Sequence, residues 1–178
     1  MSPTGIPQIK PSSYPWLINQ NESHGSSSRS AQGNAGTEGN QENNSNQTEN
    51  KNLILVNRII DGDTIELANG EKVRYIGINT PELDSHNSKI RQIAYQAKDK
   101  NTELVLGKMV ELQKDISERD KYGRLLRYVY LEDGTFINLE LVQQGFAYAS
   151  AYPPDIAHQA EFEAAQQQAR EQKIGLWQ

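Results

Sequence analysis

The chain has 178 residues, which suffices for one domain of ordinary size and argues against a two-domain enzyme. Apolar residues make up only 35%, so one segment is expected to lack a core, and no apolar run approaches the roughly 18 residues of a membrane span. The absence of cysteine excludes disulfides, zinc–thiolate sites and thiol nucleophiles, while the formal charge of −5 indicates local rather than global contacts with any polyanion.

The first 51 residues are predicted to be a disordered arm. Between residues 19 and 50, 24 of 32 residues are Asn, Ser, Gln, Gly or Thr, and such a composition cannot bury enough surface to offset chain entropy. Residues 1–18 lack the basic start and the continuous apolar stretch of a signal peptide. The sequence leaves the compartment open: secretion if translation begins upstream of Met1 and supplies a leader, and the cytoplasm otherwise.

Residues 52–178 predict one domain with five strands and three helices. The strands are expected at 53–60, 64–67, 72–78, 109–115 and 124–131. The helices are expected at 89–106, 139–144 and 155–173. The turns and stops are expected at Ala68-Asn69-Gly70, Gly107, Asp133-Gly134 and Gly145. Asn138 is expected to cap the second helix. The third helix is expected to pack through Ile156, Ala160, Ala164 and Ala165.

This order of elements predicts an α+β domain, a five-stranded antiparallel OB-fold β-barrel with three helices. In such a barrel the first helix lies between the third and fourth strands. OB-type barrels bind oligonucleotides or oligosaccharides, but the fold alone does not assign a function. The function therefore has to be inferred from the candidate site residues.

The first candidate motif is Asp61-Gly62-Asp63, at the start of the second strand. Two carboxylates two residues apart point to the same side of a strand, which suits a hard cation with oxygen ligands. The simpler interpretation is an Asp-Gly turn whose aspartates accept hydrogen bonds from backbone N–H groups. For this motif alone the turn is favoured.

The second motif runs from Arg74 to Glu82, along the third strand and past Thr80-Pro81. Beside a cation, an arginine would neutralise phosphate charge and a glutamate would activate water. The simpler interpretation is a cross-strand ion pair of small energetic value, which is favoured for this segment alone.

The third motif is Asp120-Lys121-Tyr122-Gly123-Arg124, followed closely by Arg127, Tyr128 and Tyr130. Basic groups interleaved with tyrosines suit phosphates and stacked bases. Alternatively, Tyr128 and Tyr130 place one face in the core, and Lys121 is a solvated charge in a turn.

The three histidines do not form a metal set. His24 lies in the arm, His86 in a loop and His158 on the last helix, so they are expected to be exposed rather than to bind zinc.

Taken together, the three motifs resemble those of the staphylococcal nuclease (thermonuclease) family in order and spacing. The matching segments are residues 60–64, 74–82, 120–124, 138–145 and 175–177. The resemblance extends from Leu53 to Trp177, which is nearly all of the predicted domain.

The resemblance implies a calcium ion, with magnesium or manganese as other candidates. The ion would be bound by the side chains of Asp63 and Asn79 and by the backbone carbonyl of Thr80, with Asp61 close by. Residues 51–178 hold 16 Lys and Arg against 19 Asp and Glu, a net −3. Affinity for nucleic acid is therefore expected to come from the metal and a local basic cleft.

The resemblance also implies the catalytic groups and the substrate. Glu82 would position or deprotonate the attacking water, while Arg74 and Arg124 would bind the phosphate and offset charge in the transition state. Such enzymes cut DNA and RNA, prefer single strands and leave 3′-phosphates. A monomer without a membrane partner is expected. The nucleotide would contact Lys121, Tyr122 and Tyr152.

One residue departs from the family pattern. The family usually has aspartate where this chain has Asn79, whose amide oxygen can bind calcium without a formal charge. This leaves the affinity for metal and the choice of metal open. It also supports an alternative function, a non-catalytic nucleic-acid-binding module like the nuclease-like repeats of Tudor staphylococcal nuclease proteins. The retained Asp63, Arg74, Glu82 and Arg124 favour the enzyme.

Overall fold

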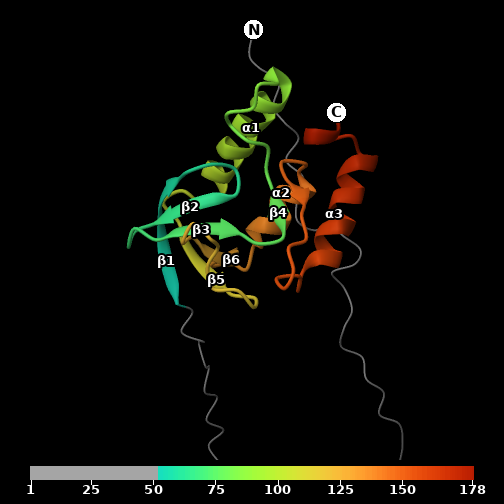
Figure 1. Ribbon diagram of the computed structural model, residues 1–178. Helices are drawn as coiled ribbons and strands as arrows, with labels where there is room; N and C mark the ends of the chain where they lie inside the picture. The colour runs from blue at the N-terminus through green and yellow to red at the C-terminus, as the bar shows by residue number, and fades with distance from the viewer. Residues whose placement is uncertain (1–51) are drawn as a thin grey trace, which may run out of the picture. The chain divides into compact units, whose positions relative to one another are not determined.

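A computed structural model describes residues 52–178, and this part of the chain forms a β-barrel flanked by three α-helices (Figure 1). The closed barrel has the strand order β1-β2-β3-β6-β5. Its strands are β1 (Leu53–Ile59), β2 (Thr64–Leu67), β3 (Lys72–Tyr75), β5 (Met109–Gln113) and β6 (Leu125–Leu131). A two-stranded sheet pairs β4 (Ile78–Asn79) with β7 (Tyr148–Ala149). The five-stranded barrel with three helices is confirmed, whereas the predicted arm, residues 1–51, lies outside the described residues.

The helices are α1 (Ser88–Val105), α2 (Ile137–Gln143) and α3 (Gln159–Glu171), with a final 3-10 turn at Gly175–Trp177. Helix α2 contacts both of the other helices and lies between them in Figure 1. Helix α1 matches its prediction, because the Asn87 side chain caps its first turn and Gly107, at φ 71°, follows its end. No helix in residues 52–178 is long and apolar enough to cross a membrane.

The prediction of an entirely antiparallel barrel is wrong in one pairing, because β3 and β6 run parallel. The register places Val73 opposite Leu125 and Arg74 opposite Leu126. The other four barrel pairs are antiparallel. Elements β4, α1 and β5 separate β3 from β6 in the chain, so the local alternation of residues carries no information about their relative direction.

The predicted strand 72–78 is divided into β3 and β4 by a turn at Gly77. This glycine has φ 77°, and a Cβ atom added to it would lie 2.3 Å from the Phe162 ring of α3. The chain therefore leaves the barrel after β3 and pairs next with β7, where Asn79 lies opposite Tyr148. This second sheet was not predicted.

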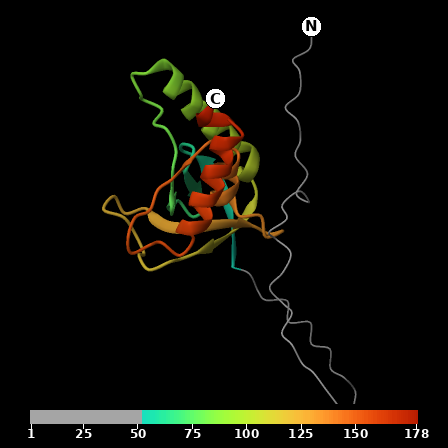
Figure 2. The same ribbon diagram turned by 90° about the vertical axis from the view of Figure 1, so that its right-hand side faces the viewer.

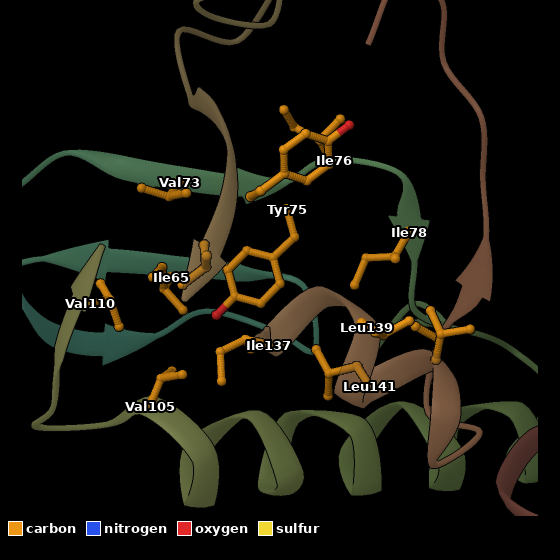
Figure 3. Packing of buried hydrophobic residues seen from close by; sticks show 14 of the residues in the cluster. Ile65, Val73, Tyr75, Ile76, Ile78, Val105, Val110, Ile137, Leu139 and Leu141 are labelled. Carbon is orange, nitrogen blue, oxygen red and sulfur yellow. The ribbon is translucent and has the colours of Figure 1, made fainter. Parts of the chain in front are cut away.

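The core fills the barrel and the space between the barrel and the helices. In β3, Val73 and Tyr75 are buried, while the alternate residues Lys72 and Arg74 point outward. Figure 3 shows the Tyr75 ring among aliphatic side chains from the strands and α2, above α1. Tyr128 is likewise buried, which confirms the core interpretation for that residue.

Helix α2 begins at Ile137, and Asn138 is not its cap as predicted. Asn138 lies inside the helix and is fully buried. Its amide nitrogen donates to the carbonyl of Ile76 at 2.9 Å, and its amide oxygen accepts from the backbone N–H of Val129 at 3.0 Å. This asparagine therefore fastens α2 to the chain at β3 and β6.

The last helix begins at Gln159 rather than Asp155, and of the four residues predicted to pack, Ala165 alone is buried. Its buried residues are Phe162, Ala165 and Ala169, whereas Ile156, Ala160 and Ala164 are exposed. Phe162 is the only large apolar side chain in α3, and its burial determines which face of α3 packs against the rest of the domain. Alanines are short enough to fit on either side of a helix, so their spacing was a weak guide.

Candidate active site

The turn before β2 holds its two aspartates in different environments. The Asp61 carboxylate accepts a hydrogen bond from the backbone N–H of Asp63 at 3.0 Å, as the turn interpretation predicts. The Asp63 carboxylate is buried and accepts from the Thr64 hydroxyl at 3.2 Å. It also accepts from the backbone N–H and the hydroxyl of Thr80, at 2.7 and 3.0 Å. The turn interpretation therefore accounts for the carboxylate of Asp61. The Asp63 carboxylate is instead a buried hydrogen-bond acceptor that connects the turn to Thr80.

Arg74 of β3 joins this turn to β4. Its Nε atom lies 3.2 Å from Asp63 Oδ1. One terminal nitrogen donates to the carbonyls of Tyr75 and Ile78, at 2.7 and 3.0 Å, and the other donates to Asn79 Oδ1 at 2.9 Å. The ion pair is largely buried, with 17% and 7% of the two side chains exposed. The interpretation as a weak cross-strand ion pair therefore does not describe Arg74, because it pairs with the buried Asp63 and its guanidinium is fixed by four acceptor groups.

Burial raises the pKa of the Asp63 carboxyl to about 6, because desolvation disfavours the charged form. The Arg74 guanidinium opposes this increase in pKa, and the neighbouring Asp61 adds to it. A further positive charge next to Asp63 would favour its ionised form.

Asn79, Thr80 and Glu82 follow one another along the chain that leaves β4. Asn79 is held by β7 and turns its amide oxygen toward Arg74, and Thr80 is buried through its bonds to Asp63. Glu82 is exposed, and its carboxylate has no hydrogen bond or ion pair with any residue in 52–178. Arg74 thus joins two of the predicted metal ligands, Asp63 and Asn79, and Thr80 is bonded to Asp63. Glu82 lies at the solvent-accessible end of the same segment.

Arg124 reaches this region through the parallel pairing of β3 and β6. Since Arg74 lies opposite Leu126, and side chains two residues apart share a face, Arg124 lies on the same outer face of the barrel as Arg74. Its Nε atom donates to Asp120 Oδ2 at 2.6 Å. No hydrogen bond from its terminal nitrogens to any described residue is present, so they are available to an anion.

Two loops are fastened together beside Arg124. The Asp155 carboxylate accepts from the backbone N–H groups of Ile116 and Ser117, at 3.0 and 2.7 Å. In return, the Asp115 carboxylate accepts from the N–H of Ala157 at 3.0 Å. Figure 2 shows the β5–β6 loop and the loop before α3 extending on the same side of the barrel. Asp155, predicted to begin a helix, therefore joins these loops.

The predicted nucleotide-binding residues lie on these two loops. The side chains of Tyr122 and Tyr152 are among the most exposed aromatic groups in residues 52–178, at 73% and 78%. Lys121 Nζ and Arg124 Cζ lie 5.0 and 5.5 Å from the centre of the Tyr122 ring. An exposed tyrosine beside two cations can stack on a base while the cations contact phosphate.

The predicted exposure of the histidines is confirmed for one of the two that the structure describes. His86 is exposed in a loop, but His158 is half-buried, with its ring 4.6 Å from Tyr128 and 4.9 Å from Phe136. His24 lies outside the described residues. Within residues 52–178 no group of three or more His, Cys, Asp or Glu side chains could hold a metal ion.

The donor atoms of the predicted metal ligands nevertheless fit a hard cation. They are all oxygens: two carboxylates (Asp61 and Asp63), one amide oxygen (Asn79) and one backbone carbonyl (Thr80). Calcium accepts such mixed sets of charged and neutral oxygens. Only two of the four groups carry a charge, and both lie in the turn before β2.

Three residues that support this region were given no role by the sequence analysis: Thr64, Asn101 and Asp120. Thr64 and Asn101 are buried and bonded to the aspartate turn, and Asp120 fixes Arg124. Thr64 and Asp120 lie in the motif segments, whereas the signal for Asn101 is a polar residue on the apolar face of α1, four residues after Ala97.

Comparisons with known proteins show which family the chain resembles. A family model described as staphylococcal nuclease homologue matches residues 72–178. The thermonuclease of Staphylococcus intermedius is 36% identical over 126 residues, which cover 69% of this chain and 74% of that protein. The thermonuclease of Staphylococcus hyicus is 36% identical over 131 residues, covering 72% and 77%. The endonuclease YncB of Bacillus subtilis is 38% identical over 129 residues, covering 70% and 61%.

Proposed function

The chain belongs to the staphylococcal nuclease family, and we propose that it is a metal-dependent nuclease that hydrolyses phosphodiester bonds in DNA and RNA with low sequence specificity. The named relatives are thermonucleases and an endonuclease, which supports hydrolysis of nucleic acid rather than binding alone.

The position of Arg74 is the observation that supports this function most strongly. Its guanidinium contacts both Asp63 and Asn79, two of the proposed metal ligands. It also shares the outer face of the β3–β6 pair with Arg124. A phosphate bound there would meet two cationic side chains beside a cluster of oxygen ligands, as phosphoryl-transfer chemistry requires.

The proposed division of labour follows from exposure and hydrogen bonding. Arg124, fixed by Asp120 through Nε, presents its terminal nitrogens to the phosphate and offsets the charge that develops in the transition state. The exposed Glu82 accepts the proton of the attacking water. As the water oxygen bonds to phosphorus, the bond to the 5′ oxygen breaks, the leaving oxygen takes a proton from solvent, and a 3′-phosphate remains.

Asp63, Asn79 and the Thr80 carbonyl would hold the cation, with Asp61 close by. When bound, a calcium ion would polarise a phosphate oxygen and help to orient the water. Single strands are the proposed substrates, since Tyr122 and Tyr152 are exposed and can stack only on bases that are not paired in a duplex.

Cleavage assays with single-stranded DNA and RNA test the function directly. The protein is assayed with calcium, magnesium or manganese and with a chelator. We expect cleavage that the chelator abolishes. Binding without cleavage in all three metals would contradict the proposal and would favour the non-catalytic binding module, for which the neutral side chain of Asn79 is the supporting feature.

Substitution of Arg124 tests its assigned role. We expect Arg124→Ala to lower the turnover rate by roughly two or more orders of magnitude while the thermal midpoint stays close to that of the wild type, because the lost contact acts on the transition state. Glu82→Gln should also lower the rate strongly. Arg58→Ala is the matched control, since Arg58 is an exposed arginine paired with Glu66. Wild-type turnover in the Arg124→Ala, Glu82→Gln double variant would exclude both roles.

A further inference from the structure

A single polar side chain interrupts the buried face of α1. That face consists of Ala94, Ala97, Asn101 and Val105. Asn101 is fully buried, with none of its surface exposed. A buried amide is destabilising unless all of its polar atoms have partners, so its partners indicate why it is there.

Both polar atoms of the Asn101 side chain are bonded to residues next to the candidate metal site. The amide nitrogen donates to the backbone carbonyl of Asp61 at 3.1 Å. The amide oxygen accepts from the hydroxyl of Tyr75 at 2.9 Å. Tyr75 is itself fully buried in the core, and Figure 3 shows its hydroxyl pointing away from β3.

Tyr75 is also bonded to the second aspartate of the turn. Its backbone N–H donates to the carbonyl of Asp63 at 2.9 Å. The side chain of Tyr75, through Asn101, and its backbone therefore fix the main chain at Asp61 and Asp63. Neither bond uses the carboxylate oxygens, so both leave the aspartate side chains to other partners.

The turn is pressed against α1 at this point. A Cβ atom added to Gly62 would lie 2.8 Å from the Cβ of Ala97 and 2.8 Å from the side chain of Thr80. Gly62 thus allows the backbone between the two aspartates to touch α1 one helical turn before Asn101. Close contact limits how far the turn can move toward α1, and the Asn101 bond limits how far it can move away.

We propose that Asn101 and Tyr75 are positioning residues that hold the main chain of Asp61-Gly62-Asp63 in the geometry for binding the cation. The inference rests on the proposed function, in which Asp63 and Asp61 face the metal. Residues that orient metal ligands from behind contribute to metal affinity without touching the metal.

The double variant Tyr75→Phe, Asn101→Leu separates positioning from stability. Removing both partners of a buried hydrogen bond and leaving apolar groups of similar shape is close to neutral for stability. That holds for the Tyr75–Asn101 bond, whereas the Asp61 carbonyl loses its donor, the only side-chain donor to it among residues 52–178. A merely structural role therefore predicts a small loss of stability with unchanged calcium affinity. A positioning role predicts a looser turn that also binds calcium more weakly.

Two measurements on the full chain report how firmly the turn Asp61-Gly62-Asp63 is held. The first is amide hydrogen exchange at Ile60, Asp61 and Asp63 in the presence of a chelator, where we expect exchange about tenfold faster than in the wild type. The second is calorimetric titration with calcium in the absence of substrate, where we expect the dissociation constant to rise about tenfold or more. Wild-type exchange rates, or faster exchange with an unchanged dissociation constant, would overturn the inference.

The controls distinguish this inference from the proposed function. Thr102→Val removes a hydroxyl of α1 that bonds only within the helix, and it should leave both measurements unchanged. If the double variant does not fold, Tyr75→Phe alone should give a smaller increase in exchange, and no increase would overturn the inference. If the wild-type protein binds no calcium, magnesium or manganese, the metal dependence is wrong, and the exchange data still decide whether Asn101 holds the turn.

Discussion

The side chain at position 79 sets the charge of the candidate metal site. In the structure Asn79 Oδ1 accepts a hydrogen bond from Arg74, which also pairs with Asp63 of the turn before β2. An aspartate at this position would add a negative charge next to the cation and would form an ion pair with Arg74. The added charge and the ion pair would both involve the oxygen at the position of Asn79 Oδ1. Asn79→Asp therefore tests directly whether residue 79 binds the metal.

We therefore expect Asn79→Asp to lower the calcium dissociation constant about tenfold or more, because calcium affinity depends on the number of charged ligands. Calorimetric titration of the two proteins measures it. Activity at limiting calcium should rise, whereas activity at saturating calcium should change less. Unchanged or weaker calcium binding in the variant would mean that position 79 does not bind the metal.

The raised pKa of Asp63 predicts how the stability of the metal-free protein depends on pH. The ordinary pKa of this carboxyl is 3.8 and the folded-state pKa is about 6. The folded protein thus binds the proton more tightly than the unfolded chain does. The stabilisation of the folded state that comes from this tighter proton binding is fully present below pH 3.8 and is lost as the pH rises through about 6.

Comparison with Asp63→Asn isolates this effect, since other titrating groups are common to both proteins. In a chelator, we expect the free energy of unfolding of the wild type, relative to that of the variant, to fall by about 1–3 kcal/mol between pH 4 and pH 7. Denaturant unfolding at several pH values measures the difference. A pH-independent difference would show that Asp63 is ionised throughout this range.

At the scale of elements, the break between β3 and β4 decides where Asn79 lies. Gly77 makes this break, with a positive φ and with the Phe162 ring in the place of a side chain. We expect Gly77→Ala to lower the free energy of unfolding by about 2–4 kcal/mol, because backbone strain and a clash with a buried ring add together.

Gly134→Ala is the matched control for this substitution. Gly134 also has a positive φ, 88°, but a Cβ atom there would have no neighbour within 4 Å. It should therefore lower the free energy of unfolding by only about 1 kcal/mol, which reflects the backbone strain alone. Equal effects of the two substitutions in denaturant unfolding would mean that the contact with Phe162 does not constrain the turn.

At the scale of the whole molecule, the chain up to residue 51 differs sharply in composition from the rest. Residues 1–50 carry two basic and four acidic side chains, so they add no electrostatic affinity for phosphate. We expect a chain that begins at Asn52 to keep the thermal midpoint and the cleavage rate of the full chain within about twofold. Unfolding or loss of activity on removal of this segment would contradict the predicted role of an arm.

The sequence by itself predicted most elements of the barrel and the residues of the site. Strand alternation located β1, β2, β5 and β6 to within a few residues, and Gly70 and Gly107 marked the ends of β2 and α1. These signals are local, because they depend on the conformational preference of each residue and on which face of an element is apolar. The site residues were inferred differently, from the combined resemblance of three motifs to the staphylococcal nuclease family, because each motif alone also had a simpler structural interpretation.

Only the tertiary structure decided how these segments meet. The parallel pairing of β3 with β6, the roles of Asn138 and Asp155, and the face through which α3 packs all depend on contacts between residues far apart in the chain. A turn with Asp61 and Asp63 is the same in sequence whether it is solvated or buried. Packing against α1 and the bonds from Tyr75, Asn101 and Thr80 bury it, and that burial gives Asp63 its raised pKa and its place beside Arg74.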